Sequence, residues 1–131
     1  MPMPIDIKDK NFLVADDSST MRRVVRSCLN RYGASDQNIA EAGDGLEALT
    51  ILQAKAIDCV LADWNMPNCD GLQLLTKMRQ IDRYKHTPFL IFTTESTKED
   101  ILTALRAGVN AYMAKPITPE LVAKKLNEVF S

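Results

Sequence analysis

Cysteine is scarce in this sequence, and the residues present fit no disulfide or metal-binding pattern. Cys28, Cys59 and Cys69 are an odd number, at spacings that match no CxxC pair. Neither a disulfide framework nor a zinc site is therefore indicated. Cys28 and Cys59 lie in apolar stretches, so we expect both in the core. We expect Cys69 in a loop, as an inert residue or alternatively as a reactive thiol.

The sequence also lacks an excess of charge of either sign and any long apolar run. Its 16 basic and 17 acidic residues give a formal net charge of -1, which does not favour a protein that binds nucleic acid or a membrane surface. The longest apolar runs, such as Cys59–Ala62 and Phe89–Phe92, fall far short of the roughly 18 residues that a membrane span needs. Met1–Lys10 has no apolar signal core. We expect a cytoplasmic protein with neither nucleic acid nor membrane as a partner.

What is present is enough apolar sequence for one core. With 131 residues, 46% of them hydrophobic, the chain has the size of one domain. We assign a polar N-terminal stub to Met1–Lys10 and the domain to residues 11–131. Apolar runs of strand length alternate with amphipathic helical patterns. The expected strands are Phe12–Ala15, Ile39–Ala42, Ile57–Ala62, Phe89–Thr93 and Ala111–Ala114. Strict strand–helix alternation predicts an α/β fold, a parallel sheet with helices on both faces.

Turn and capping signals agree with this division of the chain. Gly33 and Gly108 fall where helices should end. Ser96 with Glu99 forms a capping-box pattern that predicts the start of the fourth helix. Thr118–Pro119 similarly predicts the start of the fifth.

Residues that carry chemistry gather at the ends of the expected strands. In an open parallel sheet, the ligand crevice lies beyond the carboxyl ends of the strands. The residues expected there are Asp16, Asp17, Asp63, Thr93 and Lys115. Bringing carboxylates within about 4 Å costs on the order of 4 kcal/mol per pair at an effective dielectric near 20, unless a cation intervenes. Oxygen ligands with positions open to a phosphate favour magnesium over a fully caged calcium.

A carboxylate beside such an ion can act as a nucleophile and form an acyl phosphate. Asp63 is the best placed. Lys115, which Pro116 holds in an extended conformation, can pair with phosphoryl oxygens, and the Thr93 hydroxyl can donate a hydrogen bond. An Asp-Asp pair alone is more often a loop or a helix cap. The joint arrangement at four strand ends favours the phosphoryl-transfer site.

With these residues in place, the chain resembles the receiver domains of two-component response regulators over nearly its whole length, and most closely the CheY-like chemotaxis regulators. The segments that carry the resemblance are Phe12–Asp17, Ser19–Arg23, Asp63–Pro67, Asp70–Leu72, Thr93–Glu95 and Tyr112–Pro116. The resemblance implies a flavodoxin-like (βα)5 doubly wound sheet with strand order 2-1-3-4-5, an order for which CheY itself is a standard example.

The resemblance also implies the chemistry of the site. Asp63 would take a phosphoryl group from a phosphohistidine of a sensor histidine kinase similar to CheA, and the receiver itself would catalyse the transfer. Mg2+ would be held by Asp17, Asp63 and the Asn65 carbonyl, with Asp16 helping through a water. Asn65 and Glu95 would tune how readily water reaches the acyl phosphate.

The same resemblance implies a switch and an output surface. Thr93 and Tyr112 would move together on phosphorylation and reshape the face made by the fourth helix, fifth strand and fifth helix. On that face the expected partner-binding residues are Lys98, Ile101, Tyr112 and Lys125. The two lysines are alternatively ordinary solvated charges, and Ile101 also fits the apolar stripe of its helix. Ser18, in place of an aromatic residue, and a longer Gly33–Asn38 loop depart from the family pattern and bear on the partner rather than the chemistry.

We therefore expect a monomeric, single-domain chemotaxis regulator that is a switch rather than an enzyme. Its partners would be the kinase and a flagellar motor switch protein similar to FliM, with a phosphatase as a further candidate. The alternatives are a phosphate sink or intermediate in another phosphorelay, a small Mg-dependent phosphohydrolase, and a flavin carrier. Asn65, two places after Asp63, cannot protonate a leaving group. The phosphohydrolase is therefore disfavoured. The flavin carrier is disfavoured because the first strand leads into acids rather than a phosphate-cradling loop.

Overall fold

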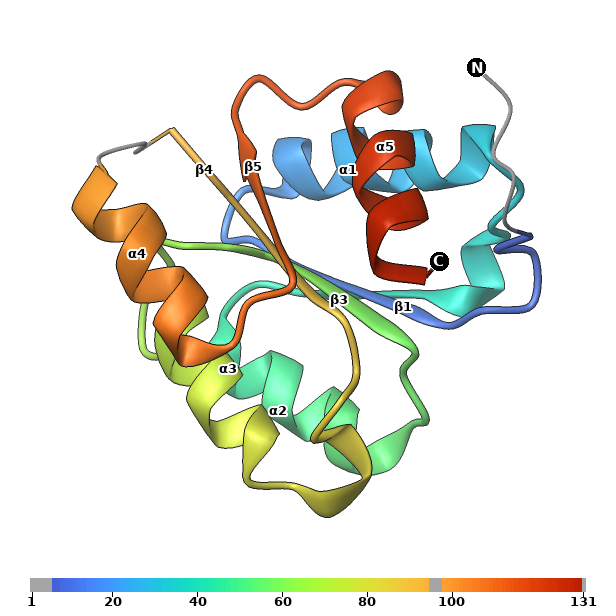
Figure 1. Cartoon of the computed structure of the whole chain (residues 1–131). Helices are drawn as coiled ribbons and strands as arrows, with labels where there is room; N and C mark the ends of the chain where they lie inside the picture. The colour runs from blue at the N-terminus through green and yellow to red at the C-terminus, as the bar shows by residue number, and fades with distance from the viewer. Residues whose placement is uncertain (1–5, 95–97, 131) are drawn as a thin grey trace.

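Five parallel strands form the centre of the molecule (Figure 1). The computed structural model describes residues 6–94 and 98–130. Four strands have the expected bounds: β1 (Phe12–Ala15), β2 (Ile39–Ala42), β4 (Phe89–Thr93) and β5 (Ala111–Ala114). With β3 (Cys59–Asp63) they form one sheet in the order β2-β1-β3-β4-β5. The doubly wound α/β fold and its strand order are confirmed.

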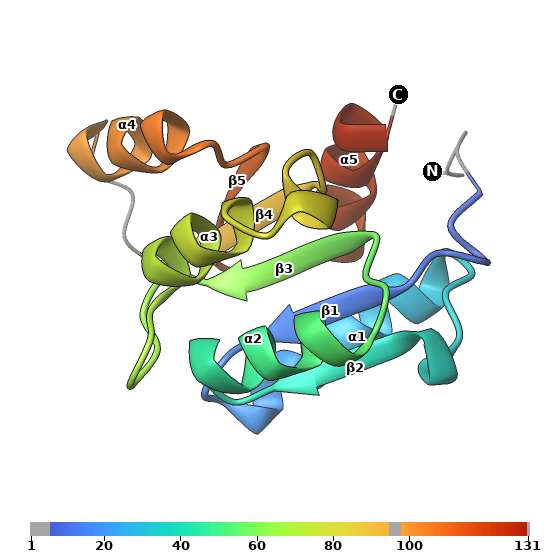
Figure 2. The ribbon, with the colours of Figure 1, turned by 90° about the horizontal axis from the view of Figure 1, so that it is seen from below.

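Helices cover both faces of the sheet (Figure 2). One face carries α1 (Ser19–Arg31) and α5 (Pro119–Phe130), and the other carries α2 (Gly45–Ala54), α3 (Gly71–Arg79) and α4 (Lys98–Ala107). Two 3-10 turns, Asp36–Asn38 and Asp82–Tyr84, precede β2 and β4. Among the described residues, none of the helices is both long and apolar enough to cross a lipid bilayer.

The alternation of side chains along each strand explains why the sheet needs helices on both sides. Phe12 and Val14 of β1 pack in the core shared with α1 and α5. Leu13 and Ala15 pack in the core shared with α2 and α3. All four are fully buried, as expected for a parallel strand that is covered on both faces.

The third strand begins and ends later than the sequence predicts. The predicted range is Ile57–Ala62, whereas β3 spans Cys59–Asp63. Asp58 lies just before the strand and is joined to the residue before β1: its N–H donates to the Asn11 carbonyl at 2.7 Å, and its carboxylate accepts a hydrogen bond from the Asn11 N–H at 2.7 Å. At the other end, Asp63 pairs with Phe92 of β4. The acidic residue is therefore held by the sheet itself.

Short polar side chains begin the helices, as the sequence patterns require. The Ser18, Asp44 and Asp70 side chains accept hydrogen bonds from the first turns of α1, α2 and α3. The Thr118 hydroxyl accepts one from the Leu121 N–H at 3.2 Å, so the predicted start of α5 is confirmed. The predicted capping box at Ser96 lies outside the described residues.

Two glycines end helices as predicted. Gly33 has φ +111 and Gly108 has φ +99, a region of backbone conformation that glycine adopts without steric cost. Each follows the last turn of a helix, α1 or α4.

The segment before β1 is not wholly polar surface. Ile7 is fully buried and belongs to the core beneath α1 and α5. The Lys10 ammonium lies 4.8 Å from the centre of the Phe130 ring, a cation–π contact. Ile7 and Lys10, which the sequence assigns to the N-terminal stub, therefore pack against the domain.

All three cysteines are buried, which confirms the expected core positions of Cys28 and Cys59. The expected loop position of Cys69 is also confirmed. Cys69 lies in the loop between β3 and α3 but is only 1% exposed. Its main-chain carbonyl accepts a hydrogen bond from the Gly45 N–H. Burial raises the pKa of the Cys69 thiol, which favours the inert residue over the reactive thiol.

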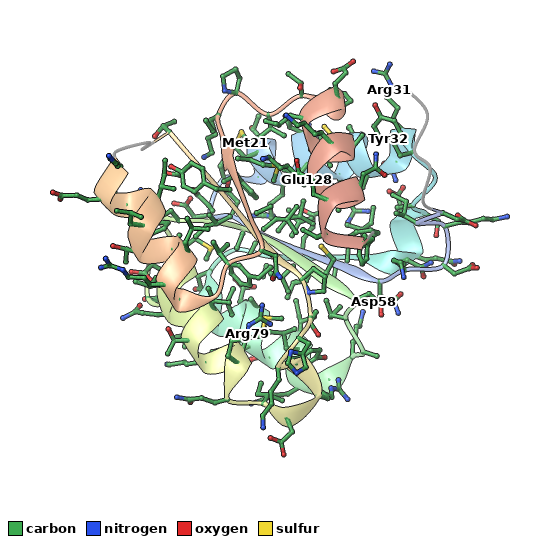
Figure 3. The ribbon with its side chains drawn as sticks, in the orientation of Figure 1. Met21, Arg31, Tyr32, Asp58, Arg79 and Glu128 are labelled. Carbon is green, nitrogen blue, oxygen red and sulfur yellow. The ribbon has the colours of Figure 1, made fainter. Side chains whose placement is uncertain are left out.

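Arg79 ties together three segments at the edge of the sheet opposite the acidic residues. It points from α3 toward the turn between α4 and β5 (Figure 3). Its guanidinium donates to the carbonyl oxygens of Tyr84 and Thr87, each at 2.7 Å, and of Gly108 at 3.3 Å. It also donates to Asn110 Oδ1 at 3.0 Å. All four acceptors are neutral oxygens, so the contribution of Arg79 is structural.

Arg79→Ala should lower the free energy of unfolding by about 3 kcal/mol, because it removes four charge-assisted hydrogen bonds and leaves partly buried acceptors without a donor. Urea unfolding followed by circular dichroism measures this change. Lys77→Ala, an exposed position of the same helix, is the matched control and should change stability by less than about 0.5 kcal/mol. Equal stability of the two variants would show that the four contacts contribute nothing.

Candidate functional site

Three carboxylates converge at the carboxyl ends of β1 and β3. One oxygen each of Asp16, Asp17 and Asp63 lies within 4.8 Å of the others. Asp16 and Asp63 are buried, at 1% and 7% exposed, and Asp17 is exposed. The sequence predicted that these residues meet, and the structure brings them together.

The end of β1 fixes Asp16. Its N–H donates to the Ala42 carbonyl at 3.0 Å, which extends the pairing with β2 by one residue. Its Oδ1 accepts from the Ser18 N–H at 2.8 Å. Ser18 also begins α1 as its cap. Ser18, which departs from the family pattern, therefore helps to orient Asp16 through its main-chain N–H.

The end of β3 fixes Asp63. The next residue, Trp64, donates its N–H to the Phe92 carbonyl at 3.1 Å, and the Asn65 main-chain N–H donates to the Asp63 carboxylate. Behind the strand, the Gly71 N–H donates to the Trp64 carbonyl at 3.0 Å. Asp63 therefore presents its carboxylate to the crevice from a rigid main chain.

Lys115 supplies the positive charge of the site. It follows β5, and its N–H donates to the Thr93 carbonyl at 2.9 Å. The ammonium lies 3.5 Å from Asp63 Oδ2, 3.8 Å from Asp16 Oδ2 and 5.6 Å from the centre of the Phe92 ring. The peptide bond to Pro116 is cis. The lysine thus reaches both buried acids along an aromatic surface.

Burial and mutual repulsion make the buried acids reluctant to ionise. Burial is the main reason that the pKa of Asp16 is raised to about 6. The Asp63 charge and a hydrogen bond with Asp17 act in the same direction, against the Ser18 N–H and Lys115. Burial also raises the pKa of Asp63, although Lys115 and the Asn65 N–H act in the opposite direction. One lysine does not compensate three carboxylates, so the cluster carries excess negative charge.

The donor set fits a hard divalent cation. Asp16 Oδ2 is buried and, among the described residues, has no hydrogen-bond partner. A buried carboxylate oxygen without a hydrogen bond is costly, and a cation beside it would reduce that cost. Carboxylate oxygens are the ligands that Mg2+ prefers. The residues present therefore fit a metal site of the kind that the sequence predicted.

Without metal, the protein should be more stable near pH 5 than near pH 7.5. Because the folded pKa of Asp16, about 6, lies above its unfolded value of about 3.9, the folded state binds more protons between these values. Stability is therefore gained as the pH falls through about 6 and lost as it rises. The pKa is lowered for three other acids, Asp36, Glu41 and Asp44. Their protonation destabilises the protein, but only at lower pH.

Asp16→Asn should remove most of this pH dependence and stabilise the metal-free protein by about 1 to 2 kcal/mol near pH 7.5. Urea unfolding in the presence of a chelator measures both effects. Asp9→Asn, which changes an exposed acid, should leave the pH dependence intact. A metal-free Asp16→Asn protein less stable than wild type at neutral pH would contradict the account of charge repulsion.

The residues predicted for the switch lie on neighbouring strands. Thr93, 1% exposed, ends β4 and pairs with Ala114 of β5. Tyr112 lies in β5 opposite Ile91, is half-buried and packs against the core beneath α3 and α4. Figure 1 shows β5 running between α4 and α5.

The residues predicted for partner binding and those predicted to control hydrolysis of the acyl phosphate lie at separate places in the structure. Lys98 is exposed at the start of α4, and Ile101 is half-buried one turn later. Lys125, on α5, lies 3.6 Å from Glu128 in an ion pair. Asn65 is exposed beside the acidic cluster, and Glu95 lies outside the described residues.

Sequence reasoning missed two contributors to the site, Arg22 and Gly71. The Arg22 guanidinium donates to the main-chain carbonyl of Asp16. Gly71 leaves no room for a side chain between α3 and the Asp63 carbonyl. Arg22 could have been found from its position one helical turn after Ser18, the residue that caps α1. Gly71 could have been found as a glycine at the first position of a helix.

Comparison with known sequences agrees with this geometry. The family described as response regulator receiver domain matches residues 12–127. Chemotaxis protein CheY1 of Helicobacter pylori is 48% identical over 118 residues, which are 89% of this chain and 94% of that protein. A chemotaxis protein CheY homolog of Campylobacter jejuni is 43% identical, over 89% of both chains.

Comparison with solved structures gives the same result. The chemotaxis response regulator CheY4 of Vibrio cholerae superposes with a TM-score of 0.84 at 32% sequence identity. The match covers 92% of this chain and 98% of that one. The similarity therefore extends over nearly the whole fold.

Proposed function

Because this chain belongs to the response regulator receiver family, whose members are phosphorylation-activated signalling switches rather than enzymes, we propose that Asp63 is the residue that accepts the phosphoryl group. The observation that carries the proposal is its position. Asp63 ends the central strand β3, is 7% exposed, and faces both a lysine and two further acids. Phosphorylation there changes the charge at the centre of the crevice.

In this proposal, a carboxylate oxygen of Asp63 attacks phosphorus, and the bond from phosphorus to the donor nitrogen breaks with its electron pair going to the donor. The Asn65 N–H and the sheet hold the carboxylate in position, which lowers the entropic cost of attack. The Lys115 ammonium lies 3.5 Å from Asp63 Oδ2. It can change its ion-pair partner from this carboxylate to the phosphoryl oxygens. The phosphohistidine of a sensor histidine kinase is the proposed donor.

We assign the cation of the site as Mg2+, held by Asp17, Asp63 and the Asn65 carbonyl, with Asp16 acting through water. When bound, Mg2+ neutralises negative charge on the transferring group and orients it. Excess negative charge in the cluster and the Asp16 oxygen that has no hydrogen bond in the described part of the chain support this assignment. We also propose that Asn65 and Glu95 control the access of water to the acyl phosphate.

The proposed response passes through Thr93 and Tyr112 to the surface of α4, β5 and α5. The Thr93 carbonyl accepts a hydrogen bond from the Lys115 N–H, so a lysine that moves toward a phosphoryl group acts on the end of β4. Tyr112 lies on the adjacent strand. The output surface in this proposal includes Lys98, Ile101, Tyr112 and Lys125.

Similarity to chemotaxis proteins of Helicobacter pylori and Campylobacter jejuni supports a role in chemotaxis, with a flagellar motor switch protein as the partner of the phosphorylated form. A fluorescent motor-switch peptide should bind about 10-fold more tightly in the presence of beryllofluoride and Mg2+, a typical size for coupling between sites. Fluorescence anisotropy measures both affinities.

The matched pair for this experiment is Lys98→Glu, on the proposed surface, and Lys77→Glu, on α3. Only the first should weaken binding of the peptide. If the wild-type protein bound the peptide equally well with and without beryllofluoride, the result would count against a motor partner. It would not count against Asp63 as the phosphorylation site.

A further inference from the structure

Asp16 is fixed by polar contacts with three other residues. Its N–H donates to Ala42 on β2, and its Oδ1 accepts from Ser18 at the start of α1. Its main-chain oxygen accepts a short hydrogen bond, 2.6 Å, from Arg22 Nη1. Only Oδ2 has no hydrogen-bond partner in the described part of the chain, and it lies 3.8 Å from Lys115 Nζ. With the other three polar atoms held, the direction of Oδ2 into the site is determined.

Arg22 is itself held by an acid on another element. Its Nε donates to Glu41 Oε1 of β2 at 2.9 Å, and its side chain is only 20% exposed. The planar guanidinium can serve two acceptors in one fixed arrangement. Arg22 therefore connects α1, β2 and the end of β1 through a single rigid group, and one of its two acceptors is the backbone of a site residue.

Arg26 provides a natural comparison, because it uses the same acid without touching the site. It donates to Glu41 Oε2 at 2.8 Å, to Asp36 Oδ1 at 2.9 Å and to the Ile39 carbonyl at 3.1 Å. These contacts join α1 to β2 as those of Arg22 do. The contact with the Asp16 carbonyl distinguishes Arg22 from Arg26.

We infer that Arg22 is a positioning residue for the cation site: it holds the main chain of Asp16 so that the carboxylates of Asp16 and Asp17 stay aimed into the crevice. This inference rests on the proposed function, because the ion concerned is the Mg2+ of the phosphorylation site. Both acids belong to the short connection between β1 and α1. Without the guanidinium, the main-chain carbonyl of Asp16 is no longer held. The side chains of Asp16 and Asp17 then no longer have a fixed direction.

The test compares Mg2+ affinity in matched variants by calorimetry. Arg22→Met keeps the apolar stem of the side chain but removes the donors, and should raise the Kd for Mg2+ about 10-fold, as loss of groups that orient metal ligands commonly does. Arg26→Met should leave this Kd unchanged, even where it lowers stability. Arg22→Lys, which can reach one acceptor but not hold two, should fall between wild type and Arg22→Met, and it decides the question if Arg22→Met does not fold.

A second readout needs no metal. Hydrogen exchange of the Ser18 amide, measured by NMR in the presence of a chelator, should be faster in Arg22→Met than in wild type and unchanged in Arg26→Met. Equal Mg2+ affinity and equal exchange in the two methionine variants would overturn the inference. A wild-type protein that binds no Mg2+ would instead overturn the proposed metal site, and the exchange of Ser18 would then decide the role of Arg22 by itself.

Discussion

The Asp63→Asn variant should take up at least about 1,000-fold less phosphoryl group than wild type from acetyl phosphate in the presence of Mg2+, because an amide cannot replace the attacking carboxylate. The rest of the site should stay in place, since Asp63 is held through its main chain in β3. Asparagine also removes one charge from a crowded acidic cluster, so the metal-free variant should fold at least as well as wild type. Intact-mass spectrometry measures the uptake directly.

Asp58→Asn is the matched control for this experiment. Asp58 precedes the same strand at its opposite end, is exposed, and accepts a hydrogen bond that asparagine can also accept. It should be phosphorylated like wild type. Undiminished uptake by Asp63→Asn would assign the acceptor to another carboxylate of the cluster, and loss of uptake in both variants would point to a general effect on β3.

The Gly71→Ala variant should be about 2 to 3 kcal/mol less stable than wild type, because the added methyl group has no space. Its Cβ would lie 2.5 Å from the Asp63 carbonyl oxygen, 3.1 Å from Ile91 Cδ1 and 3.2 Å from Trp64 Cα. Two of these are main-chain atoms, which cannot rotate away. Relief requires α3 to move from the end of β3, so the rate of phosphorylation should fall together with stability.

Gly43→Ala is the control. It tests whether the loss of stability comes from the contacts at Gly71 or would follow from replacing any glycine beside a helix. Its Cβ would meet the Glu47 carboxylate at 2.8 Å, the mobile end of a side chain. Stability should change by less than about 1 kcal/mol. Urea unfolding and initial rates of phosphorylation, measured on both variants, provide the comparison. Wild-type stability in Gly71→Ala would mean that α3 is less tightly packed than the structure shows.

The elements of the fold were predictable because their signals are local. Apolar runs bounded by polar residues predicted four strands with their observed bounds, since strands covered on both faces consist almost entirely of apolar residues. The error at β3 arose because Ile57 is apolar and buried without pairing in the sheet, while Asp63 is charged and yet pairs. Hydrophobicity reports burial more directly than it reports hydrogen bonding.

The contacts of Ile7, Cys69 and Arg22 were not predictable in the same way. The core position of Ile7 depends on its packing with α1 and α5, and the burial of Cys69 depends on the approach of Gly45 at the start of α2. The contacts of Arg22 join residues from three elements. No local pattern encodes such neighbours, because they follow from how the elements pack.

The sequence by itself determined that this protein is a parallel α/β domain with acids, a threonine and a lysine at the ends of its strands, because periodicity and the parallel arrangement decide which residues share an edge. Only the tertiary structure decided how these residues meet. The sheet sets the Asp63 main chain, Lys115 crosses the Phe92 ring to reach two acids, and Arg22 fixes Asp16. The directions and distances of side chains depend on packing between elements far apart in the chain, and that packing makes an acidic edge into a site.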